Sequence, residues 1–221
     1  MRHIKEIMIV AVCLMVLSFC VCTGFGIYFM YREGVQEYED LRTYVKETDE
    51  DDHTEGTDGS DGKQTVVDFK ALKKINPDIV AWIRIPDTSI DYPVVRGKDD
   101  MEYINKDVYG NFALSGSIFL SSANQPDFTD PYNLIYGHHM SNGAMFGDVV
   151  EFTDEAYFTA HETGTLYLPE ETRSITIFAC VEAEATDRRI YGYIAEPDTT
   201  GQMQELLSYV KEHAVQYRDI R

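Results

Sequence analysis

Cysteine is scarce in this chain, and most of it lies in one place. Three of the four cysteines, Cys13, Cys20 and Cys22, fall inside an apolar N-terminal segment, so the rest of the chain keeps only Cys180. An internal disulfide is therefore excluded for the part that follows, and that part must be stabilised by its hydrophobic core alone. The thiol of Cys180 is either packed in that core or reactive as a nucleophile.

Positive charge is also in short supply. The chain has 19 Lys and Arg residues against 38 Asp and Glu residues, a formal net charge of −19, and it shows no basic stripe. Because a protein must neutralise phosphates to bind nucleic acid, this balance excludes a nucleic-acid-binding role. Much of the negative charge lies in residues 47–61, which cannot form a core. The D-x-D-x-D-G pattern of a calcium loop is absent, and the sequence predicts no metal and no organic cofactor.

Charge of either sign is missing from residues 7–31, a run long enough to cross a bilayer as a helix. Arg2 and Lys5 precede the run and Glu33 follows it, which predicts a cytoplasmic N-terminus and an extracytoplasmic remainder. A cleaved signal peptide is the alternative, but the run is long and no A-x-A site ends it. We expect a single-pass cell-membrane protein, divided into a cytoplasmic stretch at 1–6, a transmembrane anchor at 7–31, an acidic spacer at 32–65 and a folded domain at 66–221.

The folded part alternates short apolar segments with helices of modest length. Strands are expected at 79–85, 89–95, 117–120, 165–168, 174–183 and 190–195, and helices at 68–74, 144–152, 154–161 and from residue 199 or 200 onward. Pro93 demotes its strand to an edge or a bulge. The absence of regular βαβ alternation argues against a doubly wound fold. We therefore predict a mainly β fold, with a twisted or closed sheet decorated by short helices.

Two histidines follow one of the short apolar runs. This stretch is Asn133-Leu134-Ile135-Tyr136-Gly137-His138-His139-Met140. It predicts a buried strand that delivers histidine to a loop. Because histidine exchanges protons most readily near neutral pH, any chemistry is expected here. From the residues alone, His138 is either a proton-transfer group or a satisfied core histidine.

Five segments between residues 76 and 217 together resemble the class B sortases. They are Asn76-Pro77-Asp78-Ile79-Val80-Ala81-Trp82-Ile83, Asp91-Tyr92-Pro93-Val94-Val95, Gly116-Ser117-Ile118-Phe119-Leu120, Tyr136-Gly137-His138-His139-Met140 and Met145-Phe146. Sortases are membrane-anchored cysteine transpeptidases of Gram-positive bacteria. The resemblance implies a sortase-like closed β-barrel, here incomplete at its C-terminus and preceded by one transmembrane helix.

The resemblance also implies a reaction. A secreted protein bearing a C-terminal, NPxTN-like sorting motif is cleaved through an acyl-thioester, and the acyl group passes to an amine of a cell-wall peptide. Such chemistry needs a cysteine thiolate, a histidine that protonates the leaving amine and an arginine that stabilises the oxyanion. His138 matches the catalytic histidine, and His139 packs or hydrogen-bonds nearby. The residues implied as substrate contacts, otherwise plain core or rim residues, are Tyr103, Ile104, Tyr136, Ile190 and Tyr191.

The nucleophile is harder to place. Residues 176–180 end in Cys180 and imitate the family's Thr-Leu-x-Thr-Cys strand, and Arg188 and Arg189 follow shortly. In the family, however, the cysteine strand comes after a helix-containing excursion, which here corresponds to residues 190–217. We therefore expect Cys180 to be a core cysteine and the chain to be truncated before the nucleophile, and so inactive. The alternatives are a non-catalytic membrane-anchored peptide-binding module and an active enzyme that uses Cys180 with Arg188 or Arg189.

Overall fold

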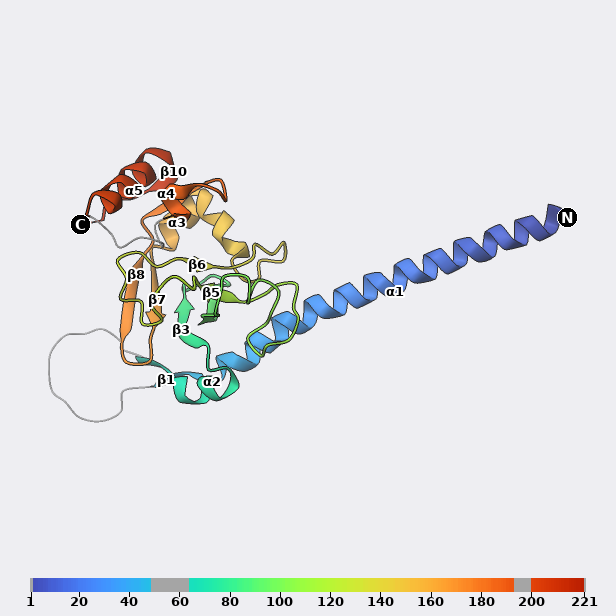
Figure 1. The fold of residues 1–221 in the computed structure, drawn as a ribbon, viewed down its shortest axis with the longest axis horizontal. Helices are drawn as coiled ribbons and strands as arrows, with labels where there is room; N and C mark the ends of the chain where they lie inside the picture. The colour runs from blue at the N-terminus through green and yellow to red at the C-terminus, as the bar shows by residue number, and fades with distance from the viewer. Residues whose placement is uncertain (1, 49–63, 193–199, 221) are drawn as a thin grey trace.

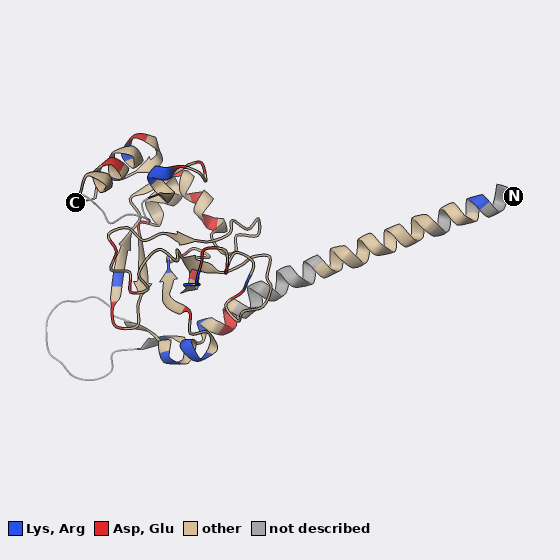
Figure 2. Ribbon diagram, viewed as in Figure 1, with Lys and Arg blue, Asp and Glu red and all other residues tan. Residues whose placement is uncertain are grey.

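A computed structural model describes residues 2–48, 64–192 and 200–220 of the chain. Figure 1 shows one long helix, α1 (Arg2–Arg42), that projects far from a β-rich domain. Its outer part, Ile7–Gly26, is long and apolar enough to cross a membrane by length and composition, and it is not buried against the domain. In Figure 2 the described part of this span is tan because it has no charged side chain. The predicted apolar N-terminal helix is therefore present.

The C-terminal end of α1 is built into the domain. Tyr38 and Leu41 are buried, and the ring of Tyr38 meets the ring of Tyr92 edge to face, with 5.2 Å between the centroids. The helix thus continues past the predicted segment at 7–31, and residues 32–42, expected as spacer, are helical. The physical reason is that the last turns of the helix bury Tyr38 and Leu41 against the apolar core of the domain. A solvated spacer would make no such contact.

A small antiparallel ribbon joins α1 to the domain. Its strands are β1 (Val45–Thr48) and β2 (Gln64–Val67), and most of the acidic run at 47–61 lies outside the described residues. Helix α2 (Phe69–Ile75) follows, and the carboxylate of Asp68 accepts a hydrogen bond of 2.9 Å from the backbone N–H of Ala71. Such a bond satisfies one of the free donors at a helix start, and it confirms the helix predicted at 68–74.

Six strands form the main sheet, in the order β6-β5-β4-β3-β7-β8. They are β3 (Ile79–Arg84), β4 (Asp91–Val95), β5 (Ile118–Leu120), β6 (Ile135–Tyr136), β7 (Thr163–Tyr167) and β8 (Thr172–Thr176). Only the β4–β5 pair is parallel. The sheet is curled, with β6 and β8 as its edges among the described strands, and short helices lie around it (Figure 1). This confirms the predicted mainly β fold with peripheral short helices.

The centre of the sheet is fully buried. Trp82 of β3 has no exposed surface, and its indole N–H donates to the carboxylate of Asp91 at 2.6 Å. Pro93 predicted an edge or a bulge, and the edge was wrong, because β4 lies between β3 and β5. The β3–β4 register does shift nearby, between Ile79 and Ala81 opposite Val95 and Val94. Pro93 lies opposite Trp82 of β3, and toward β5 the paired residues are Val94 and Val95, so the β5 ladder does not include the proline.

Several helices cover one end of the domain. The 3-10 helix η1 (Gly147–Thr153) and helix α3 (Glu155–Ala160) confirm the two short helices predicted there, and the side chain of Asp154 caps α3. Helix α5 (Thr200–His213) matches the helix predicted from residue 199 or 200. Strand β9 (Ala179–Val181) pairs with β10 (Ala214–Tyr217) in a separate ribbon, so the strand predicted at 174–183 is split between two sheets.

The strand predicted at 190–195 was wrong in its described part. Residues there belong to helix α4 (Arg188–Tyr191), and residues 193–199 lie outside the described ranges. The backbone N–H of Arg189 donates to the carboxylate of Asp187 at 3.0 Å, which starts the helix. A side-chain cap of this kind overrides the weak strand preference of a short apolar pair.

Candidate functional site

The candidate histidine follows directly on edge strand β6. Strand β6 pairs with β5 so that Tyr136 lies opposite Phe119. Gly137 then carries the chain close over the core, because an added Cβ there would overlap the side chain of Ile118 and lie 2.7 Å from the ring of Phe146. Only glycine fits this close approach, so the Tyr-Gly-His order places the imidazole of His138 at the end of the strand.

One hydrogen bond fixes the ring of His138. Its Nδ1 atom lies 3.1 Å from the backbone carbonyl oxygen of Ser115, and the side chain is half-buried. A carbonyl oxygen only accepts, so the neutral ring carries its hydrogen on Nδ1 and leaves Nε2 as the basic atom. Among the described residues, no side chain or backbone group is hydrogen-bonded to Nε2. Nε2 is therefore the atom that can exchange a proton with a bound molecule.

The loop after His138 is closed by its own backbone. The N–H of Phe146 donates to the carbonyl oxygen of His138 at 3.0 Å, and His139 is exposed, with its backbone bridged to Met145. The N–H of Met145 also donates to the hydroxyl of Tyr92 at 3.0 Å. Burial raises the pKa of Tyr92, so its hydroxyl stays neutral and accepts this bond. The same tyrosine packs on Tyr38, which links the end of α1 to the histidine loop.

Two of the predicted substrate contacts come together beside this loop. The rings of Tyr136 on β6 and Tyr191 on α4 are stacked, with 6.4 Å between their centroids and 8° between their planes. Tyr136 also lies against Phe119, with 5.1 Å between the ring centroids. Ile190 is half-buried on the same helical turn as Tyr191. The stacked rings of Tyr136 and Tyr191 form an aromatic wall, and Tyr136 stands two positions before His138 in the chain.

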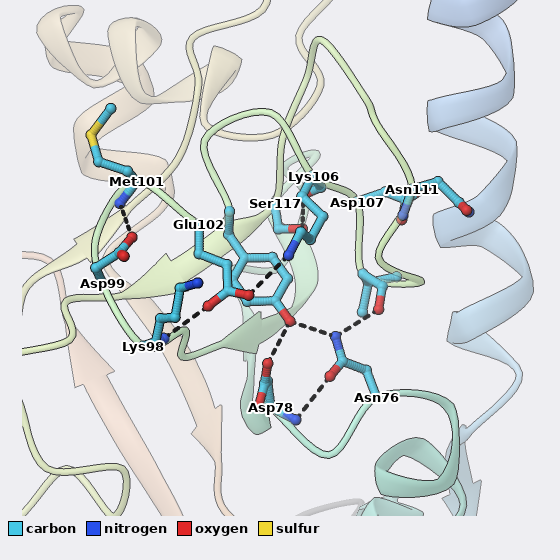
Figure 3. Close-up of polar contacts among 12 residues, drawn as sticks. Asn76, Asp78, Lys98, Asp99, Met101, Glu102, Lys106, Asp107, Asn111 and Ser117 are labelled. Carbon is cyan, nitrogen blue, oxygen red and sulfur yellow. Dashed lines mark hydrogen bonds and ion pairs between the residues drawn. The ribbon is translucent and has the colours of Figure 1, made fainter.

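The other predicted pair is placed differently. Tyr103 is only 3% exposed, and its hydroxyl donates to the carboxylate of Asp78 at 2.7 Å and accepts from the amide of Asn76 at 2.8 Å (Figure 3). Burial and the Asp78 carboxylate raise the pKa of Tyr103 well above its usual range. Ile104 is half-buried against the core. This placement favours a structural role for Tyr103 over direct contact with substrate.

Cys180 lies on a different sheet from the strand that precedes the histidine. It is half-buried on β9, outside the main sheet, and packs against the hydrophobic core. Burial raises the pKa of its thiol, and the nearby Glu182 carboxylate raises it further. A nucleophilic cysteine needs the opposite environment, one that lowers the thiol pKa. No hydrogen bond or ion pair joins Cys180 to His138 within the described part of the chain.

The candidate arginines are also not presented to His138. Arg189 makes two hydrogen bonds to the carboxylate of Asp187, at 2.9 and 2.7 Å, and its guanidinium group lies 3.8 Å from the ring centroid of Tyr209. Arg188 is exposed on α4. Among residues 2–48, 64–192 and 200–220, no group of three or more His, Cys, Asp or Glu side chains is arranged to hold a metal ion.

Sequence reasoning did not identify Ser115 or Tyr92 as supports of the site. Tyr92 stands in a segment that resembles the sortases, but its spacing from His138 gives no sign of contact. The acceptor of Ser115 is a backbone carbonyl, which every residue type provides, so no sequence pattern could have predicted it.

Comparison with known proteins identifies the class of protein to which this domain belongs. No protein-family model matches the chain. Over 154 residues, 70% of this chain, it is 32% identical to the Sortase B of Listeria monocytogenes, and it spans 61% of that protein. A Streptococcus pyogenes class B sortase involved in pilus biogenesis superposes with a TM-score of 0.62 at 38% identity, over 70% of this chain and 83% of the other. The Staphylococcus aureus sortase B–substrate complex gives a TM-score of 0.63 at 26% identity, over 69% of each chain.

The curled β domain, with a histidine at the end of an edge strand, is thus a sortase domain. Within the sortases, the chain belongs to the class B family.

Proposed function

We propose that this chain is a membrane-anchored class B sortase domain in which His138 is the general acid and base of acyl transfer. The observation that carries the proposal is the Ser115 carbonyl on Nδ1, which leaves Nε2 to move protons. In a transpeptidase such a histidine protonates the leaving amine and later deprotonates the incoming one. The substrate is a secreted protein with an NPxTN-like sorting motif near its C-terminus, and the acceptor is an amine of a Gram-positive cell-wall peptide.

Cys180 is not the nucleophile in this proposal. Its thiol is half-buried, its pKa is raised, and it lies on a ribbon separate from the strand that carries the histidine. The other three cysteines of the sequence lie in α1. These 221 residues by themselves are therefore expected to form no acyl-thioester, and a thiol from outside them would be needed for turnover.

The aromatic wall binds the sorting peptide. Tyr136 and Tyr191 present stacked rings beside the histidine loop, with Ile190 next to them. Tyr103 and Ile104 support the domain from within rather than touching the peptide. Without a competent thiol, the same surface serves a second candidate function, a non-catalytic peptide-binding module, which the environment of Cys180 favours over an enzyme that uses this residue.

The apolar helix anchors the domain in the cell membrane. The uncharged span Ile7–Gly26 and the basic residues before it support a cytoplasmic N-terminus with residues 66–221 outside. The last turns of α1 belong structurally to the domain, since Tyr38 and Leu41 are buried in it.

A binding and trapping experiment tests the proposal. The full chain in detergent micelles is mixed with a fluorescent NPxTN-type peptide, and anisotropy and intact-mass spectrometry are recorded. The expected result is saturable binding that Tyr136→Ala weakens, with no covalent adduct. An adduct on Cys180 that disappears in His138→Ala would show instead that Cys180 is the nucleophile. Absence of binding would contradict the peptide site itself.

A further inference from the structure

The loop of residues 109–116 has no charged residue, although the chain as a whole is strongly acidic. It exposes three large apolar side chains, those of Tyr109, Phe112 and Leu114, and Phe112 is 68% exposed. Single exposed apolar residues are ordinary, but three within six positions of an uncharged loop concentrate exposed apolar surface in one short segment. Exposed apolar surface of this kind is typical of a site that contacts another protein or a membrane.

The loop is held in shape by buried polar groups. Asp107 is only 2% exposed, and its carboxylate accepts a hydrogen bond of 2.7 Å from the backbone N–H of Asn111 (Figure 3). At the other end, Gly116 has a φ of +57°, and an added Cβ would lie 2.7 Å from the carbonyl oxygen of Tyr103. The outward position of Phe112 is therefore built into a fixed turn.

The loop lies beside α1 where the helix leaves the domain. Figures 1 and 3 both show this arrangement, and the hydroxyl of Tyr38 donates to the carbonyl oxygen of Gly116 at 3.3 Å. About 18 Å of helix separate Gly26, the end of the apolar span, from Tyr38, at 1.5 Å per residue. The chain from Gly116 out to Phe112 reaches at most about 13 Å. Four residues of a folded turn cover less than that maximum, so the remaining gap is at least about 5 Å, which is comparable to the thickness of one headgroup layer.

We propose that the 109–116 loop rests on the outer surface of the membrane and places Phe112 and Leu114 among the lipid headgroups. The inference rests on the proposed membrane anchor, because α1 sets the height of the loop. Aromatic and leucine side chains are suited to this interface. A domain of strong negative charge is repelled by anionic lipid, and an uncharged loop beside α1 can approach the lipid without that repulsion.

The contact reaches the candidate histidine. Ser115, in the same loop, provides the carbonyl that holds Nδ1 of His138. A membrane-bound loop therefore steadies the proton-transfer group as well as the domain.

Fluorescence quenching tests the contact. Phe112→Trp in the full chain is reconstituted into phosphatidylcholine–phosphatidylglycerol vesicles with or without brominated lipid. Leu207→Trp, on α5 at the end of the domain away from α1, is the matched control, since Leu207 is 41% exposed. The parent chain gives the emission of the buried Trp82. Brominated lipid should quench most of the added emission of Phe112→Trp and leave that of Leu207→Trp unchanged.

Flotation of the vesicles separates the two hypotheses. If the chain floats but Phe112→Trp is quenched no more than the control, the loop contact is wrong and the anchor stands. If the chain does not float, the anchor is wrong and the loop contact falls with it. Shielding of Phe112→Trp that needs no lipid and rises with protein concentration would show contact between two copies, and would also overturn the proposal.

Discussion

The Nδ1 atom of His138 lies 3.1 Å from the carbonyl oxygen of Ser115, a residue 23 positions earlier in the chain. This one contact decides which ring nitrogen is free. It also joins the histidine to a loop that is itself fixed to α1 through Tyr38 and Gly116. The proton-transfer group, the loop and the helix therefore form one connected unit.

The first prediction concerns the tautomer of His138. The neutral ring should carry its hydrogen on Nδ1, because the Ser115 carbonyl can only accept. Long-range ¹⁵N–¹H correlation spectra above the histidine pKa distinguish the two nitrogens, with His138→Gln identifying the signal. The exposed His139 serves as the internal control and should show the mixed tautomers of a solvated ring. A hydrogen on Nε2 of His138 would contradict the proposed role of Ser115.

The second prediction concerns Gly137. Substitution by alanine puts a methyl group into the side chains of Ile118 and Phe146, and should lower the free energy of unfolding by about 1–3 kcal/mol, the usual cost of overpacking. Urea titration followed by tryptophan fluorescence measures the change. Gly201→Ala is the control, because an added Cβ there meets open space within α5. It should be neutral or stabilising by up to about 1 kcal/mol. Equal effects at both positions would refute the packing argument.

The third prediction concerns the thiol of Cys180. In a chain whose other cysteines are replaced by serine, alkylation by iodoacetamide should be slow at pH 7 and should accelerate only above the pH range of an ordinary free thiol. The reason is that burial, with help from Glu182, raises the thiol pKa. Because the thiol pKa is higher in the folded than in the unfolded chain, the protonated thiol of Cys180 contributes to the free energy of unfolding at neutral pH. This contribution is lost as the pH rises through the folded-state pKa. Rapid alkylation at pH 7 would support Cys180 as a nucleophile.

The fourth prediction separates two tyrosines that the sequence treats alike. Tyr103→Phe removes the hydroxyl that accepts from the Asn76 amide and donates to the Asp78 carboxylate, and should cost about 1–3 kcal/mol of stability with peptide affinity unchanged. Tyr136→Phe keeps the stacked ring and should change neither, whereas Tyr136→Ala should weaken peptide binding. Urea titration of each variant gives its free energy of unfolding, and peptide anisotropy gives its affinity for the peptide. If Tyr103→Phe lost peptide affinity while its free energy of unfolding stayed unchanged, Tyr103 would have to contact the peptide directly.

Local signals explain why much of the fold was predictable. Asp68 and Asp154 stand where helix starts need a side-chain acceptor, and each caps a helix that the sequence predicted. Short apolar runs predicted most of the strands, because the length of each run matches that of a short strand in the sheet. The family resemblance then identified His138 as the candidate site residue, although its catalytic role stays a prediction.

Tertiary context explains what was missed. Pro93 stands in a central strand at a position that pairs with β3 but not with the short β5, and no local pattern reveals the length of a neighbouring strand. Helix α4 is set by a single cap from Asp187. The burial of Tyr103 depends on Asn76 and Asp78, which lie about 25 residues away and look like ordinary turn residues in the sequence.

If α1 is the proposed membrane anchor, its unbroken course into the domain also fixes how the domain is rotated about the helix axis. One residue inserted between Gly26 and Tyr38 would turn the domain by about 100° about the helix axis and lift it by about 1.5 Å. Seven inserted residues would restore the facing to within about 20° while raising the domain by about 10 Å. Azimuth and height of the domain above the bilayer are therefore separately adjustable, and the native helix length selects one value of each.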